Sequence, residues 1–259
     1  MYGAITGDIC GSIYEFENFK TDNPAEIPIP EVRCFFTDDT VLTCAIMDAL
    51  LTDRDYERAV YAWANKYPNC GYGGRFQSWF RAKKPEPYNS WGNGSAMRVS
   101  PVGWAFNTIE ETLTEARCSA DITHSHPEGI KGAQATAAAV FLARHGESKK
   151  KIKSYIEKTF GYNLKRTLKE IRRNYKFNES CQGTVPEAII AFLESDDFTG
   201  AIQNAISLGG DSDTLACITG GIAEAYYKRI PIGLFNFASW KMTNEMVELL
   251  GRFYTMFYD

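Results

Sequence analysis

Residues 206–227, with the sequence ISLGGDSDTLACITGGIAEAYY, contain the pattern that decides the fold. Apolar residues at helical spacing predict one helix over 199–208 and another over 214–227, and the polar GGDSD between them predicts a sharp turn. In a non-helical turn, residues i and i+2 face the same side, so we expect Asp211 and Asp213 to converge on one centre. The two glycines allow a close backbone approach and positive φ angles.

Helical periodicity continues along the rest of the chain, where strand-like alternation is scarce. It predicts buried helices over 39–51 and 129–145. The run Thr184-Val185-Pro186-Glu187 has the threonine, early proline and third-position glutamate of a capping box, so it predicts the start of another helix. Segments 20–34 and 68–94, rich in proline or glycine, are expected to be irregular loops. Long loops in a compact helical domain often carry function.

Composition and charge narrow the class of protein. With 259 residues and 44% hydrophobic content the chain can bury a large core, so we expect one domain over residues 1–259. The start MYGAITGDICGS lacks the features of a signal peptide, and no apolar stretch is long enough to cross a bilayer. These features predict a cytoplasmic protein without a membrane partner. A net charge of −4 gives no general attraction to nucleic acid, and we expect a monomer.

Cysteine and histidine content limits the kinds of metal site. The seven cysteines form an odd set without a C-x-x-C pair, which indicates reduced packing residues rather than disulfides or zinc ligands. The three histidines are His124, His126 and His145, and the last is expected at the surface, at a helix end. A bound metal would therefore have oxygen ligands, which favours magnesium or manganese over zinc.

Basic residues are concentrated in segment 149–176 around regularly spaced apolar residues. This pattern favours an amphipathic pair of helices with a solvated basic face. A patch that binds phosphate or nucleic acid is the alternative. We expect the segment to be dispensable for chemistry.

The first of three acidic clusters is Gly7-Asp8-Ile9-Cys10-Gly11-Ser12-Ile13-Tyr14-Glu15. If it is helical, Asp8, Ser12 and Glu15 share one face, at positions i, i+4 and i+7. Three glycines would then form a smooth ridge for close helix packing: Gly3, Gly7 and Gly11. A tight helix contact with two solvated acids is the alternative interpretation.

The second cluster is Thr37-Asp38-Asp39-Thr40, which follows apolar residues and opens a helix. Acids and threonines often cap helices, but a cap needs only one such side chain. Two adjacent carboxylates near a core repel each other, so a cation is a plausible third party. The third cluster adds Asp211, Asp213 and Thr214. Together the two clusters supply enough carboxylates and hydroxyls for a pair of hard cations.

A glycine-rich turn, Ser90-Trp91-Gly92-Asn93-Gly94-Ser95-Ala96-Met97-Arg98, leads into an expected helix. Successive backbone N–H groups at such a turn form an anion-binding nest, and Arg98 adds positive charge. The turn is therefore a candidate phosphate site. A glycine-rich turn without a ligand is the alternative.

Seven ordered motifs cover most of the chain: GDICGSIYE at 7–15, FTDDT at 36–40, GYGGRF at 71–76, SWGNGSAMRVSPVGW at 90–104, THSHPEGIKGA at 123–133, CQGTVPEAIIAFLES at 181–195 and ISLGGDSDTLACITGGIAEAYY at 206–227. In this order they resemble the ADP-ribosylglycohydrolase family, which includes the dinitrogenase-reductase-activating glycohydrolase and the ADP-ribosyl-acceptor hydrolases. The resemblance implies an all-α fold, a compact orthogonal helical bundle. It also implies a dinuclear magnesium centre at the base of a cleft, with manganese as a substitute.

The same resemblance implies roles for individual residues. The implied metal ligands are Thr37, Asp38, Asp39, Asp211, Asp213 and Thr214. Gly92, Asn93, Gly94, Ser95 and Met97 resemble a diphosphate cradle. Glu15, Asp38 and Asp39 are the candidate catalytic residues, with Glu15 in proton transfer. His124 matches a polar contact to ADP-ribose, with a hydrogen-bonded histidine at a helix start as the alternative. Tyr72 and Trp91 are candidates for an aromatic wall at the adenine.

The function implied is hydrolysis at the anomeric carbon of the distal ribose, which releases ADP-ribose from a modified acceptor. A hydrolase of free ADP-ribose derivatives such as O-acetyl-ADP-ribose is the first alternative. A non-catalytic ADP-ribose-binding or structural homologue is the second, and the complete set of acidic residues argues against it. The acceptor linkage stays open between arginine, serine, a nucleic-acid end and a free metabolite.

Overall fold

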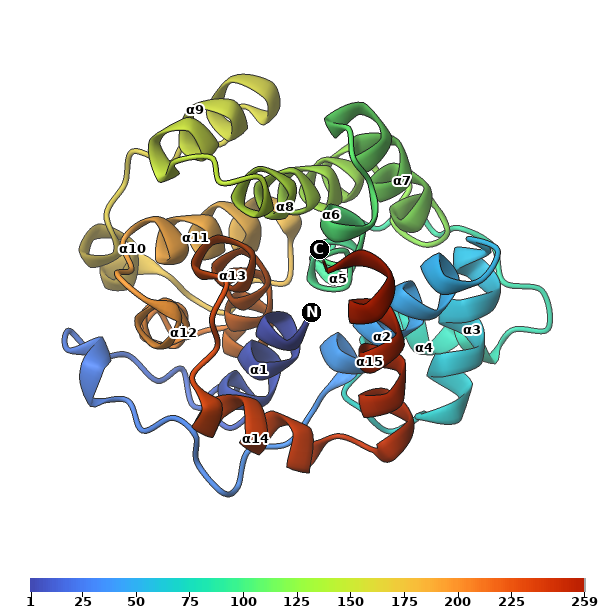
Figure 1. Ribbon diagram of the computed structural model, residues 1–259, viewed down its shortest axis with the longest axis horizontal. Coiled ribbons are helices and arrows are strands. Elements are labelled where there is room, and N and C mark those ends of the chain that lie inside the picture. Colours follow the sequence, from blue (N-terminus) through green and yellow to red (C-terminus); the bar gives the residue numbers. More distant parts are fainter. Residues whose placement is uncertain (259) are drawn as a thin grey trace.

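The structure, a computed structural model, describes residues 1–258, and throughout this range it consists of helices and loops (Figure 1). An isolated β-bridge joins Gly92 and Ser180. The all-α expectation is confirmed. The elements are α1 (Tyr2–Gly11), η1 (Pro24–Glu26), α2 (Asp38–Leu51), α3 (Tyr56–Lys66), α4 (Gly74–Arg81), α5 (Gly94–Met97), α6 (Val102–Ala105), α7 (Ile109–Asp121), α8 (Pro127–Arg144), α9 (Lys149–Phe160), α10 (Leu168–Asn174), α11 (Cys181–Leu193), α12 (Phe198–Ile206), α13 (Ser212–Tyr227), α14 (Ile232–Lys241) and α15 (Asn244–Phe257).

Helices α1 and α13 pack side by side in the middle of the molecule, and the other helices surround them (Figure 1). Every residue of α1 is buried. The expected glycine ridge is present and faces α13. A Cβ built on Gly3 would lie 2.2 Å from the carbonyl oxygen of Gly220, and one built on Gly7 would lie 2.0 Å from that of Ala216. Because the helices run antiparallel, the end of α1 lies beside the start of α13, where Asp211 and Asp213 are found.

The glycine ridge gives a stability prediction. Gly7→Ala forces a methyl group into the backbone of α13, and we expect it to lower the free energy of unfolding by about 3 kcal/mol. The matched control is Gly233→Ala in α14, where an added Cβ meets no atom within 4 Å. That change is expected to be neutral or to stabilise the helix by up to about 1 kcal/mol. Equal denaturant midpoints for the two variants would contradict the tight α1–α13 contact.

The helices expected from periodicity are present, with two corrections. The helix assigned to a Thr184 cap begins earlier, at Cys181, because Ser180 is the N-cap and its Oγ accepts a hydrogen bond from Gly183 N at 3.1 Å. Thr184 instead donates to the carbonyl oxygen of Asn178 at 2.8 Å. Within the segment expected to be irregular, 68–94, helix α4 forms because its aromatic residues pack into the core.

The basic segment is less solvated than its composition suggests. Lys149 Nζ donates to the carbonyl oxygen of Leu193 at 3.3 Å and to that of Ser195, at the end of α11, and it lies 5.1 Å from the ring centre of Phe192. Arg166 forms an ion pair of 2.7 Å with the buried Glu187. Lys150, Lys151 and Lys158 are exposed, as expected for a solvated basic face, whereas Lys149 and Arg166 hold neighbouring segments together.

Lys149 and Lys150 are adjacent lysines in different surroundings, which allows a direct comparison. Lys149→Gln removes a charged donor from two carbonyl oxygens and a cation–π contact, so we expect a loss of about 1–2 kcal/mol in unfolding free energy. Lys150 is exposed, and Lys150→Gln should change stability by less than about 0.5 kcal/mol. Thermal denaturation of the two variants checks this, and equal midpoints would count against a structural role for Lys149.

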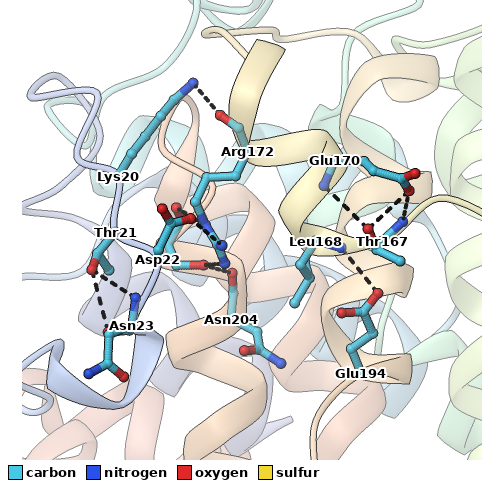
Figure 2. Close-up of polar contacts among 11 residues, drawn as sticks. Lys20, Thr21, Asp22, Asn23, Thr167, Leu168, Glu170, Arg172, Glu194 and Asn204 are labelled. Atoms are coloured by element: carbon cyan, nitrogen blue, oxygen red, sulfur yellow. Dashed lines mark hydrogen bonds and ion pairs between the residues drawn. The ribbon is translucent and has the colours of Figure 1, made fainter.

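The long loop between α1 and α2 is tied to α10 by polar contacts (Figure 2). Lys20 Nζ donates to the carbonyl oxygen of Arg172 at 3.0 Å and to that of Tyr175. The buried guanidinium of Arg172 donates in turn to Ser207 Oγ at 2.8 Å and to Asp22 Oδ1 at 3.3 Å. These contacts fix the loop that follows α1 against the segment that follows α10.

Two further expectations concern cysteines and membrane association. All seven cysteines are free, and five of them are buried, in agreement with a packing role. Among residues 1–258, no helix combines the length and apolar character needed to span a bilayer.

Candidate active site

A cavity of about 370 Å³ opens where α13 begins, at the end of α1. Its wall comes from the loop after α1, the start of α2, the glycine-rich segment before α4, the 88–98 segment and residues 177–179. Glu15 lines this cavity. The structure also brings every candidate cation ligand to it: Thr37, Asp38, Asp39, Asp211, Asp213 and Thr214.

The carboxylates of the cavity lie close together. Glu15, Asp211 and Asp213 each offer an oxygen, and these oxygens all lie within 4.8 Å of one another. Asp39 Oδ1 accepts a hydrogen bond from Thr214 Oγ1 at 3.2 Å. Its other oxygen, Oδ2, is buried and has no hydrogen-bond partner among the described residues. A buried carboxylate oxygen without a donor is costly, so this side chain suits a cation.

Asp8 holds the start of α2 in place and is not one of the solvated acids considered from the sequence. It is fully buried and accepts hydrogen bonds from the backbone and hydroxyl of Thr37 and of Thr40. The Thr37 Oγ1–Asp8 Oδ1 distance is 2.6 Å. Since the hydroxyl hydrogen of Thr37 is donated to Asp8, its oxygen offers only lone pairs to the cavity.

Glu15 reaches the cavity by a different route from the helical one expected. Helix α1 ends at Gly11, and the residues that follow form turns, so Asp8 and Glu15 do not share a helix face. A Cβ on Gly11 would lie 2.6 Å from Asp213 Cα, which leaves no room for a bulkier residue between the end of α1 and α13. The turn after Gly11 then brings Glu15 next to Asp213.

Burial and mutual repulsion raise the pKa of every carboxylate in the group. The pKa values of Asp38 and Asp39 rise well above the usual range. The main cause is burial, and the second is the charge of Asp213. Burial raises the pKa of Asp211 to about 6. The pKa of Glu15 rises to about 8 because of burial and then the charge of Asp213. A cation would offset all of these effects.

The glycine-rich turn forms the second half of the cavity. Gly92, Asn93, Gly94 and Met97 line it. Asn93 links the turn to the carboxylates, because its Nδ2 donates to Asp211 Oδ2 at 2.6 Å. Its own backbone N–H is used by the carbonyl oxygen of Glu179 at 2.7 Å, so the N–H groups open to an anion are those that begin α5.

His124 also lines the cavity, beside Gly94. Its Nδ1 lies 2.7 Å from Thr123 Oγ1. Burial lowers the pKa of His124 well below its usual value, with the charges of Arg98 and Arg75 as further causes. The imidazole is therefore neutral, and it offers the cavity a hydrogen-bonding group without charge.

Three sequence candidates lie outside the cavity wall. The hydroxyl of Ser95 is buried and donates to the carbonyl oxygen of Gly129 at 2.8 Å. Tyr72 packs against Phe76 and Phe80 in the core. Trp91 is exposed and makes an edge contact with His126.

Other side chains that sequence reasoning did not select line the cavity. Tyr88 does so, with the guanidinium of Arg75 5.0 Å from its ring centre. Arg75 lies within the GYGGRF motif, so the sequence contained an indication that it belongs to the site. Three phenylalanines at the mouth had no such signal: Phe16, Phe35 and Phe177.

Fold and site together define an all-helical protein with a buried carboxylate cluster beside a glycine-rich turn. A family model for ADP-ribosylglycohydrolase matches residues 1–253, so the chain belongs to the ADP-ribosylglycohydrolase family.

Individual relatives agree with this assignment. ADP-ribosylhydrolase ARH3 of Mus musculus is 26% identical over 329 aligned positions, which cover 96% of this chain and 87% of that protein. ADP-ribosylarginine hydrolase Tri1 of Pseudomonas putida (strain GB-1) is 23% identical, with 88% of this chain and 69% of that protein covered. A solved structure of an ADP-ribosylglycohydrolase-related protein complex has a TM-score of 0.75 and 25% identity, and the match covers 98% of this chain and 95% of that one.

Proposed function

We propose that this chain is a divalent-cation-dependent hydrolase that releases ADP-ribose from a modified acceptor by cleavage at the anomeric carbon of the distal ribose. The observation that carries the proposal is the buried carboxylate cluster linked through Asn93 to the glycine-rich turn. Such a pair of neighbouring sites suits a substrate with a diphosphate and a reacting sugar. The names of the ARH3 and Tri1 relatives support the same class of substrate.

The residues of the cavity fit two hard cations. Magnesium takes oxygen ligands, and the set offers four aspartates and two threonine hydroxyls: Thr37, Asp38, Asp39, Asp211, Asp213 and Thr214. The buried Oδ2 of Asp39 lacks a hydrogen-bond partner among the described residues. The Thr37 oxygen has already given its hydrogen to Asp8. An oxygen without a hydrogen-bond donor and a hydroxyl oxygen with a free lone pair are both suitable cation ligands. Manganese suits the same ligands.

In the reaction proposed, the protein positions the sugar and moves a proton. Bound hard cations would neutralise the carboxylates and polarise oxygens of the substrate and water. The first N–H groups of α5 bind the diphosphate, and His124 adds a neutral hydrogen bond beside them. Cleavage passes through an oxocarbenium-like state. Glu15 lies at the carboxylate cluster. As a general acid it donates a proton to the departing oxygen or nitrogen of the acceptor, and as a general base it accepts one from the attacking water.

The experiment that tests the proposal is a panel of four substrates with magnesium and with EDTA. The panel contains arginine-linked, serine-linked and nucleic-acid-linked ADP-ribose and O-acetyl-ADP-ribose, and the readout is released ADP-ribose. We expect release from at least one macromolecular acceptor, with magnesium only. Release from O-acetyl-ADP-ribose alone would replace the proposal with a hydrolase of free derivatives. No release from any substrate would contradict it.

A further inference from the structure

A second cavity, of about 460 Å³, lies at the opposite end of the central helix pair from the active site. Its walls come from the start of α1, the end of α13, α14 and α15, which neighbour one another in the fold (Figure 1). Gly3 of α1 faces Gly220 of α13, and Gly11 faces Asp213, so the two helices run antiparallel. The active-site cavity opens at the Gly11 end, and the second cavity opens at the Gly3 end. The proposed hydrolysis therefore makes no use of the second cavity.

Four aromatic side chains line this cavity: Tyr2, Phe235, Tyr254 and Tyr258. The ring centre of Tyr2 lies 4.3 Å from that of Phe235 and 5.7 Å from that of Tyr254. Tyr258 is 39% exposed, and its ring stacks on that of Trp104 with 4.8 Å between the centres. Cavities of about 300–1,000 Å³ lined by aromatic side chains and a few polar groups are typical small-molecule sites. Because aromatic rings attract one another through stacking and edge contacts, these walls suit a planar aromatic molecule.

Positive charge predominates among the ionisable groups of this cavity wall. Among the described residues, the carboxylate of the wall is Glu224, which is 3% exposed. It is already engaged, because it forms an ion pair with the amine of Met1 and accepts a hydrogen bond from the hydroxyl of Tyr254. Lys228 and Arg229 line the same cavity and are exposed. The wall therefore offers two cations to a ligand, which favours a ligand with negative charge.

Lys228 occupies a backbone position that favours glycine. It directly follows α13, with a φ of 53° and a ψ of 20°, and its N–H donates to the carbonyl oxygen of Glu224. Helices often end on a glycine in this left-handed conformation, which is unfavourable for a residue with a Cβ. A residue held in such a conformation is a candidate for a functional side chain, and that of Lys228 lines the cavity. A favourable interaction of the lysine with the carboxyl end of α13 is the alternative.

We propose that this cavity is a binding site for a small planar aromatic molecule with an anionic group, the chemistry of an aromatic carboxylate or sulfonate. Lys228 and Arg229 pair with the anion. The rings of Phe235 and Tyr258 contact the aromatic part. The site is separate from the active-site cavity, and the inference does not depend on the proposed hydrolase function.

The test uses naphthalene-2-sulfonate as the probe and naphthalene-2-sulfonamide as an uncharged molecule of nearly the same shape. Calorimetry measures the affinity of the protein for each. We expect wild type to bind the sulfonate about 10-fold more tightly than the sulfonamide, since a charged partner strengthens a hydrogen bond by about that much. Lys228→Gly should lose about 10-fold in affinity for the sulfonate and keep that for the sulfonamide within about twofold. Tyr258→Ala should weaken both probes, because both contact its ring.

Lys228→Gly suits the left-handed backbone, so it should fold with a thermal midpoint at or above that of wild type. Its matched control is Arg54→Gly. Arg54 is also an exposed cation at a positive φ, of 61°, and it lies outside the wall of this cavity. The control variant loses the same charge and should bind both probes as wild type does.

Failure of wild type to bind the sulfonate, or equal affinities for the two probes, would overturn the proposed site. A lower thermal midpoint of Lys228→Gly with unchanged affinity for the sulfonate would assign the lysine to the end of α13 and would also overturn it. Binding that neither Lys228→Gly nor Tyr258→Ala changes would show that the probe binds elsewhere on the protein. Loss of sulfonate affinity in Lys228→Gly but not in Arg54→Gly supports the site.

Discussion

Asp211→Asn is expected to abolish ADP-ribose release while the chain stays folded. The asparagine keeps an oxygen for the hydrogen bond that Asn93 donates at 2.6 Å, but it removes a charge from the cluster that would hold the cations. Poor positioning of the reacting groups should lower turnover by more than about 10²-fold. Asp38→Asn should have the same effect, because Asp38 lines the same cavity. Released ADP-ribose, measured with magnesium, is the readout.

The same substitution should leave the metal-free protein equally stable or more stable. Burial raises the pKa of Asp211 to about 6, so its contribution to stability is lost as the pH rises through that value. In EDTA, the wild-type melting temperature should therefore fall between about pH 4 and pH 6, from the ordinary pKa of an aspartate to the raised one, more than that of the variant. Asp196→Asn makes the same change at an exposed position and should alter neither activity nor stability. Wild-type turnover by Asp211→Asn would contradict the role of this carboxylate.

Glu15→Gln should keep ADP-ribose binding and lose turnover by about 10²- to 10⁴-fold, the usual contribution of a general acid or base. The glutamine has almost the same shape but transfers no proton. Glu15 belongs to the close group with Asp211 and Asp213, and its pKa of about 8 without metal means that it carries a proton near neutral pH. Single-turnover release and calorimetry with ADP-ribose separate chemistry from binding.

Glu17→Gln is the control for this experiment, because Glu17 is an exposed acid two residues away and lies outside the cavity wall. It should behave like wild type. Near-normal turnover by Glu15→Gln with intact ADP-ribose affinity would rule out proton transfer by Glu15. A parallel loss of affinity and turnover would assign Glu15 to binding instead.

Much of the fold follows from features that act locally in the sequence. Gly3 and Gly7 could be recognised as a packing ridge because small residues four apart always share one helix face. The turn before α13 was predictable because Gly209 and Gly210 both adopt a φ of 73°, a conformation that glycine tolerates best. Asp211 and Asp213 converge as expected, but Asp213 lies in the first turn of α13, which begins at Ser212, and not in a non-helical turn.

The surroundings of several site residues could not be predicted from the sequence, because they depend on which distant residues become neighbours in space. In the sequence, nothing distinguishes Asp8 from a solvated acid. Only the folded chain brings Thr37 and Thr40 close enough to donate hydrogen bonds to its buried carboxylate. Tyr72 and Tyr88 are both tyrosines in a glycine- and proline-rich segment, and sequence alone does not indicate that α4 draws Tyr72 into the core while Tyr88 faces the cavity. The phenylalanines at the mouth of the cavity, Phe16, Phe35 and Phe177, likewise come from separate segments.

The most direct test of the proposed function is a magnesium titration of the metal-stripped protein, followed by the rate of ADP-ribose release from an ADP-ribosylated substrate that wild type cleaves. The account predicts no release in EDTA and a rate that rises with added magnesium to a plateau, because the buried carboxylates hold the substrate's reacting sugar only with their cations. Full release in EDTA, with no change on addition of magnesium, would contradict it.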